Sequence, residues 1–279
     1  RLGRMAWSGS TTIEVKSGYG LDPESERTLL EVAAVLDRAQ PYTVVTTFLG
    51  AHVVPVEYRD RRDEYVELVC GPMMEACAPL AEFCDVFCDE AAFTVEEARR
   101  ILEAGRAHGL KPKLHADQLG RVGAARLAAE VGAVSADHVD HASDADLAAL
   151  AEAGTVAVLL PGASFSMRLP FPDGRRVWDA GVTVALATDC NPGTSWVERM
   201  GFVVALAVLE LGLTPAEALW AATRGGALAL DRPDRGRLTP GDRGDLVVLD
   251  APSHLHLAYR PDRDLTAVVV VAGEVLGRR

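Results

Sequence analysis

Apolar runs typical of buried strands alternate with amphipathic runs typical of helices along most of this chain. Strands that alternate with helices in sequence pair into a parallel sheet and are joined by right-handed crossovers. The pattern predicts an α/β fold, a (β/α)8 TIM-type barrel whose first strand is missing, because only seven strand-like runs are visible. We expect strands at Thr11–Lys16, Tyr42–Phe48, Val86–Cys88, Pro112–His115, Val134–Ala136, Thr155–Leu160 and Val182–Ala187.

Helix starts stand between several of these runs. A Ser or Thr followed three residues later by an acidic residue forms a capping box, in which side chains bond the free N–H groups of the first turn. An Asp followed by Pro places a capping carboxylate before a proline at the first helical position. The residue pairs that predict helix starts are Asp22 with Pro23, Thr94 with Glu97, Ser143 with Asp146 and Thr214 with Glu217.

The last part of the chain changes character after Asp231. Short apolar runs alternate there with Pro-Gly and Gly-Asp turns, in RPDRGRLTPGDRGDLVVLD and DLTAVVVVAGEVL. Such alternation is typical of β-hairpins. We therefore expect two regions, with residues 1–231 forming the barrel and residues 232–279 forming part of a small β-sandwich.

Four of the expected strands lead into a polar residue that packing does not require. The run VTVALATDCNPGTS passes from a β-branched strand into Asp189, and His52, His115 and His138 follow other strands in the same way. Each has a plainer explanation, since an Asp often caps the next helix and a lone His is more often a core residue. Together they indicate a functional site, because active sites of (β/α)8 barrels lie at the C-terminal ends of the strands.

The composition limits the class of protein further. The chain has 279 residues, 49% of them hydrophobic, which is ordinary for a globular enzyme. A formal net charge of -12 argues against nucleic acid or an anionic membrane surface as a partner. No apolar run approaches the roughly 20 residues of a membrane span, and the first residues lack the apolar core of a secretory signal. Five cysteines without a C-x-x-C pair predict reduced thiols, so we expect a cytoplasmic protein.

A family resemblance rests on five segments spread over the barrel part of the chain. They are EVKSGYGLD (Glu14–Asp22), TFLGAHVVP (Thr47–Pro55), KLHADQ (Lys113–Gln118), SADH (Ser135–His138) and ATDCNPGTS (Ala187–Ser195). In this order they resemble the imidazolonepropionase family of the metal-dependent amidohydrolase superfamily. The resemblance implies a barrel with a β-sandwich built from both chain ends. It also implies a small-molecule substrate, 4-imidazolone-5-propanoate, whose ring is hydrolysed to N-formimino-L-glutamate in histidine breakdown.

The same resemblance implies the roles of individual residues. His115 and Asp189 correspond to ligands of one metal ion, zinc or iron, and His138 to the group that handles the attacking water or the intermediate. Asp189 is also our expected base, because it would lie close to the attacking water. A homodimer is implied by the family alone. The residues implied to bind substrate are Tyr19, His52 and Asn191.

Two features depart from the family pattern. Gln118 stands where some relatives carry glutamate, and a neutral amide cannot act as a base, so we expect Gln118 to position groups at the catalytic site. The superfamily also takes two ligands from a His-x-His pair on the first barrel strand. The one such pair here, His254 and His256, follows the last barrel element, and two strand residues facing one side explain it better. We therefore expect that an N-terminal part with the first strand, the metal-binding pair and an arginine for the substrate carboxylate is missing.

Two other functions stay open at this point. One is a different cyclic amidohydrolase or a deaminase of the same superfamily, against which the SGYG and TDxNPG segments weigh. The other is a non-catalytic scaffold that kept the barrel and lost the metal. The retention of costly polar residues at the strand ends opposes the scaffold.

Overall fold

The computed structural model describes residues 1–90 and 92–278, which fall into two compact units. One unit is Glu14–Thr155, called here the 14–155 unit. The other joins Arg1–Ile13 to Val156–Arg279 and is called the 156–279 unit. Each unit is described by itself.

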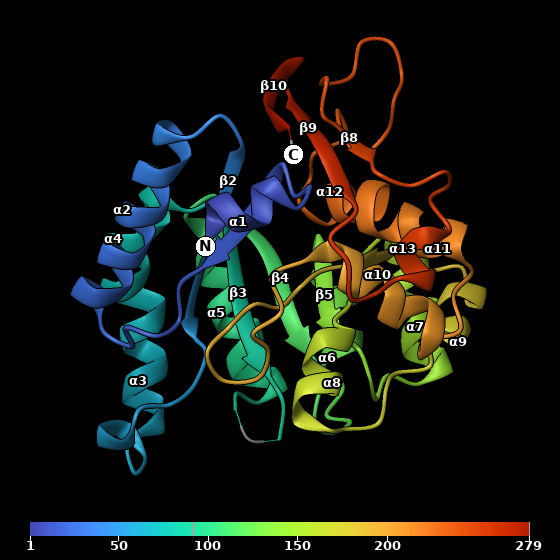
Figure 1. The fold of residues 1–279 in the computed structure, drawn as a ribbon. Helices are drawn as coiled ribbons and strands as arrows, with labels where there is room; N and C mark the ends of the chain where they lie inside the picture. The colour runs from blue at the N-terminus through green and yellow to red at the C-terminus, as the bar shows by residue number, and fades with distance from the viewer. Residues whose placement is uncertain (91, 279) are drawn as a thin grey trace. The chain divides into compact units, whose positions relative to one another are not determined.

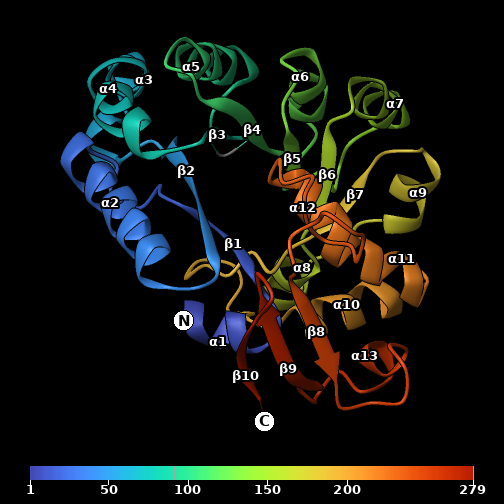
Figure 2. The same ribbon diagram turned by 90° about the horizontal axis from the view of Figure 1, so that it is seen from above.

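Strands β1 to β5, which lie side by side in chain order, form the centre of the 14–155 unit (Figures 1 and 2). Strands β2 to β5 pair in parallel, as the alternating pattern predicts. The register sets Asp85 opposite Lys113, and it sets His115 opposite both Phe87 and Asp137. The strands are β1 (Thr12–Lys16), β2 (Thr43–Ala51), β3 (Phe83–Cys88), β4 (Lys111–Ala116) and β5 (Ser135–His138).

Helices cover the outer side of these strands (Figure 2). Helix α2 packs against β2, α5 against β3 and β4, and α6 against β4 and α7. The predicted helix starts are confirmed, because Asp22 accepts the N–H groups of Glu24 and Ser25 and both Thr94 and Ser143 complete capping boxes. The helices of this unit are α2 (Pro23–Ala39), α3 (Arg62–Leu68), α4 (Met74–Cys77), α5 (Val95–Ala107), α6 (Ala124–Glu130) and α7 (Asp144–Ala153).

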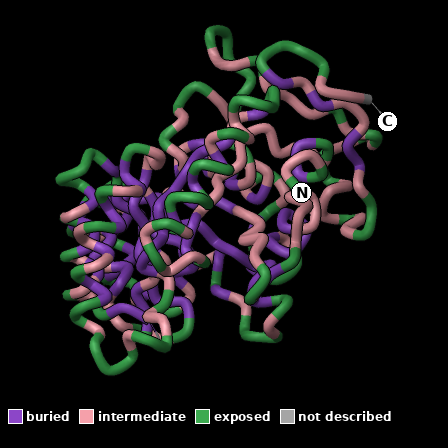
Figure 3. Tube along the Cα trace, turned by 90° about the vertical axis from the view of Figure 1, so that its left-hand side faces the viewer, coloured by how far each residue is buried: buried purple, intermediate pink, exposed green. Residues whose placement is uncertain are grey.

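The core of the 14–155 unit lies between the strands and these helices. Buried positions concentrate inside the chain trace and exposed positions on its outer turns (Figure 3). Leu30 on α2, Val86 on β3 and Leu114 on β4 are almost fully buried. Cysteines at 70, 77, 84, 88 and 190 are free thiols, and burial raises the pKa of Cys88 to about 12, so this thiol stays protonated and packs as a small apolar side chain.

The 156–279 unit contains a second parallel pair, β6 (Val156–Leu159) with β7 (Val184–Leu186). Its core is a cluster of Val, Leu and Ala side chains from these strands and from α12. Thr214 completes the third predicted capping box. The helices around this pair are α8 (Pro161–Met167), α9 (Gly174–Asp179), α10 (Met200–Leu209), α11 (Pro215–Trp220) and α12 (Gly226–Ala229).

The chain end forms an antiparallel sheet of β8 (Leu246–Leu249), β9 (Thr266–Val271) and β10 (Glu274–Arg278), in the order β10-β9-β8. Helix α1 (Leu2–Trp7) contacts β9. Ala272 and Gly273 both have positive φ, 51° and 86°, which gives the tight turn of a two-residue hairpin between β9 and β10. The predicted hairpin in AVVVVAGEVL is therefore confirmed.

One local expectation is wrong in this region. SHLHLAY, interpreted above as strand, instead begins with turns, and His256 opens the short helix α13 (His256–Tyr259). The two histidines therefore do not alternate along a strand face. The ring of His256 packs edge-on against Tyr259, one helical turn away.

Among the described residues, no helix combines the length and the apolar character that crossing a membrane requires.

Candidate active site

A chain of five aromatic rings lines the ends of β1 to β4 and reaches β5. Tyr19 packs edge-on against His52 with ring centroids 5.1 Å apart, and Phe87 follows at 6.1 Å from His52. His115 lies 5.9 Å from Phe87, and His138 lies 5.7 Å from His115. Four predicted site residues of the 14–155 unit are thus brought together. Phe87 is the ring that joins them, and no motif of the sequence pointed to it.

The loop that carries Tyr19 is held by a buried carboxylate. Glu26, fully buried on α2, accepts the N–H groups of Gly18, Gly20 and Leu21 at 2.8, 2.6 and 2.9 Å. Charge-assisted bonds of this kind are strong and directional. Tyr19 itself is half exposed at the tip of this loop, so part of the residue is accessible from outside.

The SGYG loop is also tied to His52. The ring of His52 bonds the carbonyl oxygen of Gly18 through Nδ1 at 2.9 Å. Gly18 has φ of +108° and lies so close to Leu49 and His52 that a side chain would clash, which accounts for glycine there. Burial lowers the pKa of His52, so the ring is neutral and donates its Nδ1 proton to that carbonyl.

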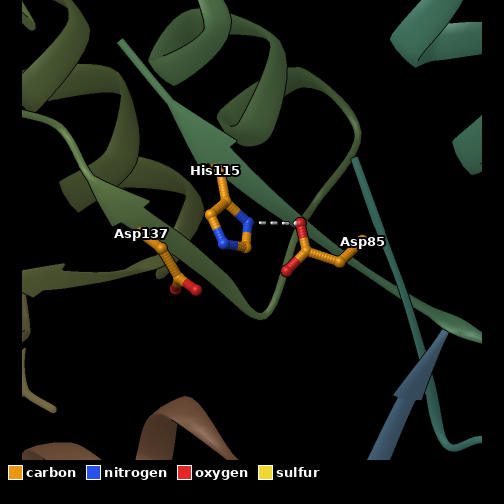
Figure 4. A group of neighbouring side chains, drawn as sticks. All are labelled: Asp85, His115 and Asp137. Atoms are coloured by element: carbon orange, nitrogen blue, oxygen red, sulfur yellow. Dashed lines mark hydrogen bonds and ion pairs between the residues drawn. The ribbon is translucent and has the colours of Figure 1, made fainter. Parts of the chain in front are cut away.

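A charged layer lies beside His115, on the strand faces that point the same way. Lys16 Nζ bonds Asp85 Oδ2 at 2.5 Å and Asp137 Oδ2 at 2.6 Å. His115 Nδ1 bonds Asp85 Oδ1 at 3.1 Å, and Asp137 lies on the other side of the ring (Figure 4). Asp85 is fully buried, so both of its oxygens are committed to cationic or N–H partners.

Opposite charges determine how these groups titrate. Burial alone would raise the pKa of Asp85, but the charges of His115 and Lys16 outweigh it and hold that pKa well below its usual range. Burial would lower the pKa of Lys16, yet Asp137 and Asp85 together raise it well above the ordinary value. For His115, burial again opposes the charge, and Asp85 outweighs it and raises the pKa. Lys16, Asp85 and Asp137 are therefore ionised at neutral pH.

The donor atoms of Asp85, His115 and Asp137 lie within 4.8 Å of one another, close enough in principle to share a metal ion. Lys16 already takes that place, because its ammonium is in direct contact with both carboxylates. The atom that fits a metal is instead Nε2 of His115. It has no hydrogen bond to any residue that the structure describes, and Asp85 holds the ring from its other nitrogen. This is the usual arrangement of a metal-binding histidine.

His138 lies at the end of β5 in an unusual backbone conformation. Its φ is +74° and that of Val139 is +56°, values that cost free energy for residues other than glycine and that recur at functional sites. The side chain is 2% exposed, and within the described parts of the chain its ring nitrogens have no hydrogen-bond partner. Burial lowers the pKa of His138 to about 3, with the charge of His115 acting in the same direction, so the imidazole is neutral. A buried, neutral and unpartnered histidine is suited to bind a ligand group.

Gln118 is buried just beyond β4. Its backbone N–H donates to Asp89 Oδ2 at 2.7 Å, which fixes the loop, while its side-chain amide has no hydrogen bond to the described part of the chain. Asp117 in the same HADQ segment accepts four N–H groups at the start of α6, and so it holds that helix. Gln118 is therefore the member of HADQ, besides His115, whose side chain is open to a ligand.

Asp189 and Asn191 belong to the 156–279 unit, just beyond β7. Asp189 has φ of +49°, so it also lies in the left-handed region, as do Asp117 and His138 at other strand ends. The Asn191 side chain donates to the Asp189 carbonyl oxygen at 2.7 Å and accepts the N–H groups of Gly193 and Thr194 at 2.8 and 2.7 Å. Asn191 thus closes the NPGT turn that follows Asp189. Its role toward substrate stays a prediction, as does metal binding by Asp189.

Several residues of the site escaped the sequence analysis. Glu26 looked like one more acidic residue in the first turn of a helix, and Lys16, Asp85 and Asp137 looked like strand ends or interruptions. A signal was available in Lys16 and Lys113, because each is a charged residue two positions from another polar group within an apolar strand. Such alternation places both side chains on one face, and a charge there needs a buried partner.

The amino-acid sequence matches a known protein family. A sequence model of the amidohydrolase family matches residues 30–276. The imidazolonepropionase of Mycolicibacterium smegmatis is 57% identical over 96% of this chain, and that of Salinispora arenicola is 56% identical over 97%. The chain spans 66% and 68% of the lengths of these two relatives.

Solved structures agree on the fold. An adenosine deaminase from Xanthomonas campestris with bound zinc superposes with a TM-score of 0.74 at 20% identity, covering 98% of this chain and 67% of that one. A triazine hydrolase variant gives 0.77 at 19% identity, covering 99% and 70%. The predicted fold class, the amidohydrolase type of (β/α) barrel, is confirmed. The chain belongs to the amidohydrolase family and, within it, to the imidazolonepropionases.

Proposed function

We propose that this protein hydrolyses 4-imidazolone-5-propanoate to N-formimino-L-glutamate. Water adds across the bond between the ring carbonyl carbon and the neighbouring ring nitrogen. The hydroxyl group stays on carbon, which becomes a carboxylate, and a proton goes to nitrogen as the ring opens. The observation that carries the proposal is identity above 50% to curated imidazolonepropionases along nearly the whole chain, which includes the ring-lined strand ends described above.

We propose one zinc or iron ion as cofactor, held by His115 Nε2 and by the Asp189 carboxylate. When bound, such an ion lowers the pKa of a water and polarises a carbonyl group. Nitrogen and oxygen ligands suit zinc and iron alike, so the donor atoms leave both metals open. The free Nε2 of His115 supports this assignment.

Other steps of the reaction are carried out by side chains of the protein. Asp189 accepts the proton of the attacking water and delivers it to the departing ring nitrogen, since Gln118 cannot act as a base. His138, neutral and buried, donates a hydrogen bond to the carbonyl oxygen as negative charge develops there. The Gln118 amide orients the attacking water. Tyr19 and His52 contact the substrate from the SGYG side of the ring chain.

The reaction is tested by following the ultraviolet absorbance of the imidazolone ring with purified protein. We expect loss of absorbance that stops when a chelator removes the metal and returns when zinc or iron is added. Both substrate nitrogens remain in N-formimino-L-glutamate, so no ammonia should be released. Ammonia release from a purine or triazine instead would identify a deaminase, and inactivity on all of these substrates would favour the scaffold.

The substitution Glu26→Gln should weaken substrate binding. The amide cannot accept all three N–H groups of the loop, so Glu26→Gln is expected to raise KM by about tenfold, the equivalent of one buried bond at 1.4 kcal/mol. The value of kcat should change by less than about twofold, because the metal ligands are untouched. Steady-state kinetics on the imidazolone separates the two parameters.

The matched control for this variant is Glu24→Gln, an exposed position on the same helix. It should leave both parameters unchanged. A Glu26→Gln protein that loses kcat with unchanged KM would contradict the proposed role of the Tyr19 loop in binding substrate.

We also propose that the protein acts as a homodimer, as the family resemblance implies, and that it is cytoplasmic, as its cysteine pattern predicts. Light scattering of the eluting protein gives its mass in solution. A monomeric mass would contradict the proposed dimer and would leave the proposed reaction unaffected.

A further inference from the structure

Lys16 lies between two of the three groups that could otherwise take a metal ion, the carboxylates of Asp85 and Asp137. Its Nζ lies 2.5 Å from Asp85 Oδ2 and 2.6 Å from Asp137 Oδ2, and 3.8 Å from Glu14 Oε2. A lysine ammonium donates three hydrogen bonds and accepts none. The carboxylates around it are therefore forced to present oxygen atoms to Lys16, and their orientation is fixed.

Asp85 transmits this orientation to His115. One carboxylate oxygen bonds Lys16. The other faces Nδ1 of His115 at 3.1 Å (Figure 4). Asp85 is fully buried on β3, between β2 and β4, so it has no room for a different rotamer without breaking both contacts. A neutral imidazole that faces a carboxylate must carry its proton on that side.

We infer that Lys16 and Asp85 form a positioning pair that holds His115 in the Nδ1–H tautomer and so presents the lone pair of Nε2 to the metal site. Lys16 neutralises the Asp85 carboxylate and fixes its orientation. The Asp85 carboxylate in turn determines which nitrogen of His115 carries the proton. The inference rests on the proposed function only in taking Nε2 as a metal-binding atom. The tautomer itself is a property of the protein without metal or substrate.

The alternative role for this cluster is that of a metal site made of Asp85, His115 and Asp137. That role needs Lys16 to leave, because a cation bound by both carboxylates would collide with the ammonium. Ser135 further fixes Asp137 by donating to its second oxygen, Oδ1, at 3.2 Å. The cluster is thus complete as a protein-only ion network.

The experiment is a long-range nitrogen–proton NMR spectrum of metal-free protein labelled with 15N in its histidine rings, at an alkaline pH where imidazoles are neutral. The His115 signal is assigned by its loss in His115→Gln. We expect the Nδ1–H tautomer in the unsubstituted protein. An Nε2–H tautomer there would overturn the inference without any variant having to fold.

Asp85→Asn sharpens the test, because it inverts the expected tautomer. Lys16 can only donate, so it takes the amide oxygen, and the amide NH2 group then faces Nδ1 of His115. The ring must accept at Nδ1 and carry its proton on Nε2. A folded Asp85→Asn protein with an unchanged tautomer would also overturn the inference. The control is Asp146→Asn, a buried carboxylate that contacts Arg121 and Arg126 and has no contact with His115, and it should leave the tautomer as it is.

Metal affinity is the second readout. Loss of a carboxylate that orients a metal-binding histidine typically weakens binding about 10- to 100-fold. We expect this loss for zinc in Asp85→Asn by competition with a chelator, and none in Asp146→Asn. If the tautomers behave as expected and zinc affinity does not change, the positioning pair stands and His115 as metal ligand in the proposed function fails.

Discussion

Replacing Lys16 with methionine should lower the free energy of unfolding by about 3–5 kcal/mol, the cost of removing one partner from a buried ion network. Methionine fills a similar volume but removes the ammonium that contacts both Asp85 and Asp137, which leaves His115 as the contacting partner of Asp85. Denaturant unfolding at neutral pH measures the change. The matched control is Lys111→Met, the same substitution at an exposed position on β4, which should stay within about 0.5 kcal/mol.

The difference in the free energy of unfolding between the unsubstituted protein and Lys16→Met should depend on pH, and this dependence identifies its cause. In the unsubstituted protein the pKa of Asp85 and that of Asp137 lie below their ordinary values, so their stabilising contribution is present above about pH 4 and is lost as the pH falls further. Loss of the Lys16 charge raises the pKa of each carboxyl from this lowered value, so the Lys16→Met protein loses less stability than the unsubstituted protein as the carboxyls take up protons. The difference in unfolding free energy between the two proteins should therefore become smaller as the pH is lowered from 7 toward 4. A difference that is constant with pH would mean that lost packing, and not charge, is responsible.

The Asp189→Asn substitution should abolish turnover, with a loss of kcat of about 10³-fold or more, because it removes the negative charge of a metal ligand and the expected base together. Asparagine tolerates the positive φ of this residue and keeps the shape of the side chain. Asp189→Ala should lose as much activity, but alanine also strains the backbone at this positive φ. Only Asp189→Asn therefore separates the loss of catalysis from a loss of fold stability. The imidazolone absorbance assay measures kcat, and thermal unfolding checks the fold.

The matched control for Asp189→Asn is Asp179→Asn, an exposed aspartate of the same unit that pairs with Arg175. It should retain full activity. If Asp189→Asn kept more than about a tenth of the turnover, proton transfer by Asp189 could not stand, and another group would have to be the base.

Sequence patterns predicted the seven strands of the barrel to within three residues. Two of the differences have a common cause. The expected strand at Val86–Cys88 begins at Phe83, and the one at Val134–Ala136 extends to His138. In both places an aspartate inside an apolar run suggested that the strand was interrupted. Asp85 and Asp137 point into the interior because Lys16 neutralises them there, and a pairing between residues so far apart in sequence leaves no local pattern.

The residues of the candidate site were predictable where a polar residue directly follows an apolar strand. His52, His115 and His138 stand at such ends, and the structure brings their rings into one chain. Phe87 was not predictable, because a phenylalanine in a strand is ordinary core until its neighbours are known. Glu26 was hidden for a related reason: its partners are backbone N–H groups, which every sequence has.

The burial of lysine has a practical consequence for chemical labelling. Lysine stands at positions 16, 111 and 113 of this chain, and arginine carries nearly all of its other fixed positive charge. Lys113 is 1% exposed and Lys16 is enclosed by carboxylates, whereas Lys111 is exposed. An amine-reactive reagent should therefore modify the side chain of Lys111 on the native protein and reach the other two only when the β-strands open. Mass-resolved acylation at these positions then reports the opening of the interior directly, and cross-linkers or surfaces that depend on lysine would capture the folded molecule in nearly a single orientation.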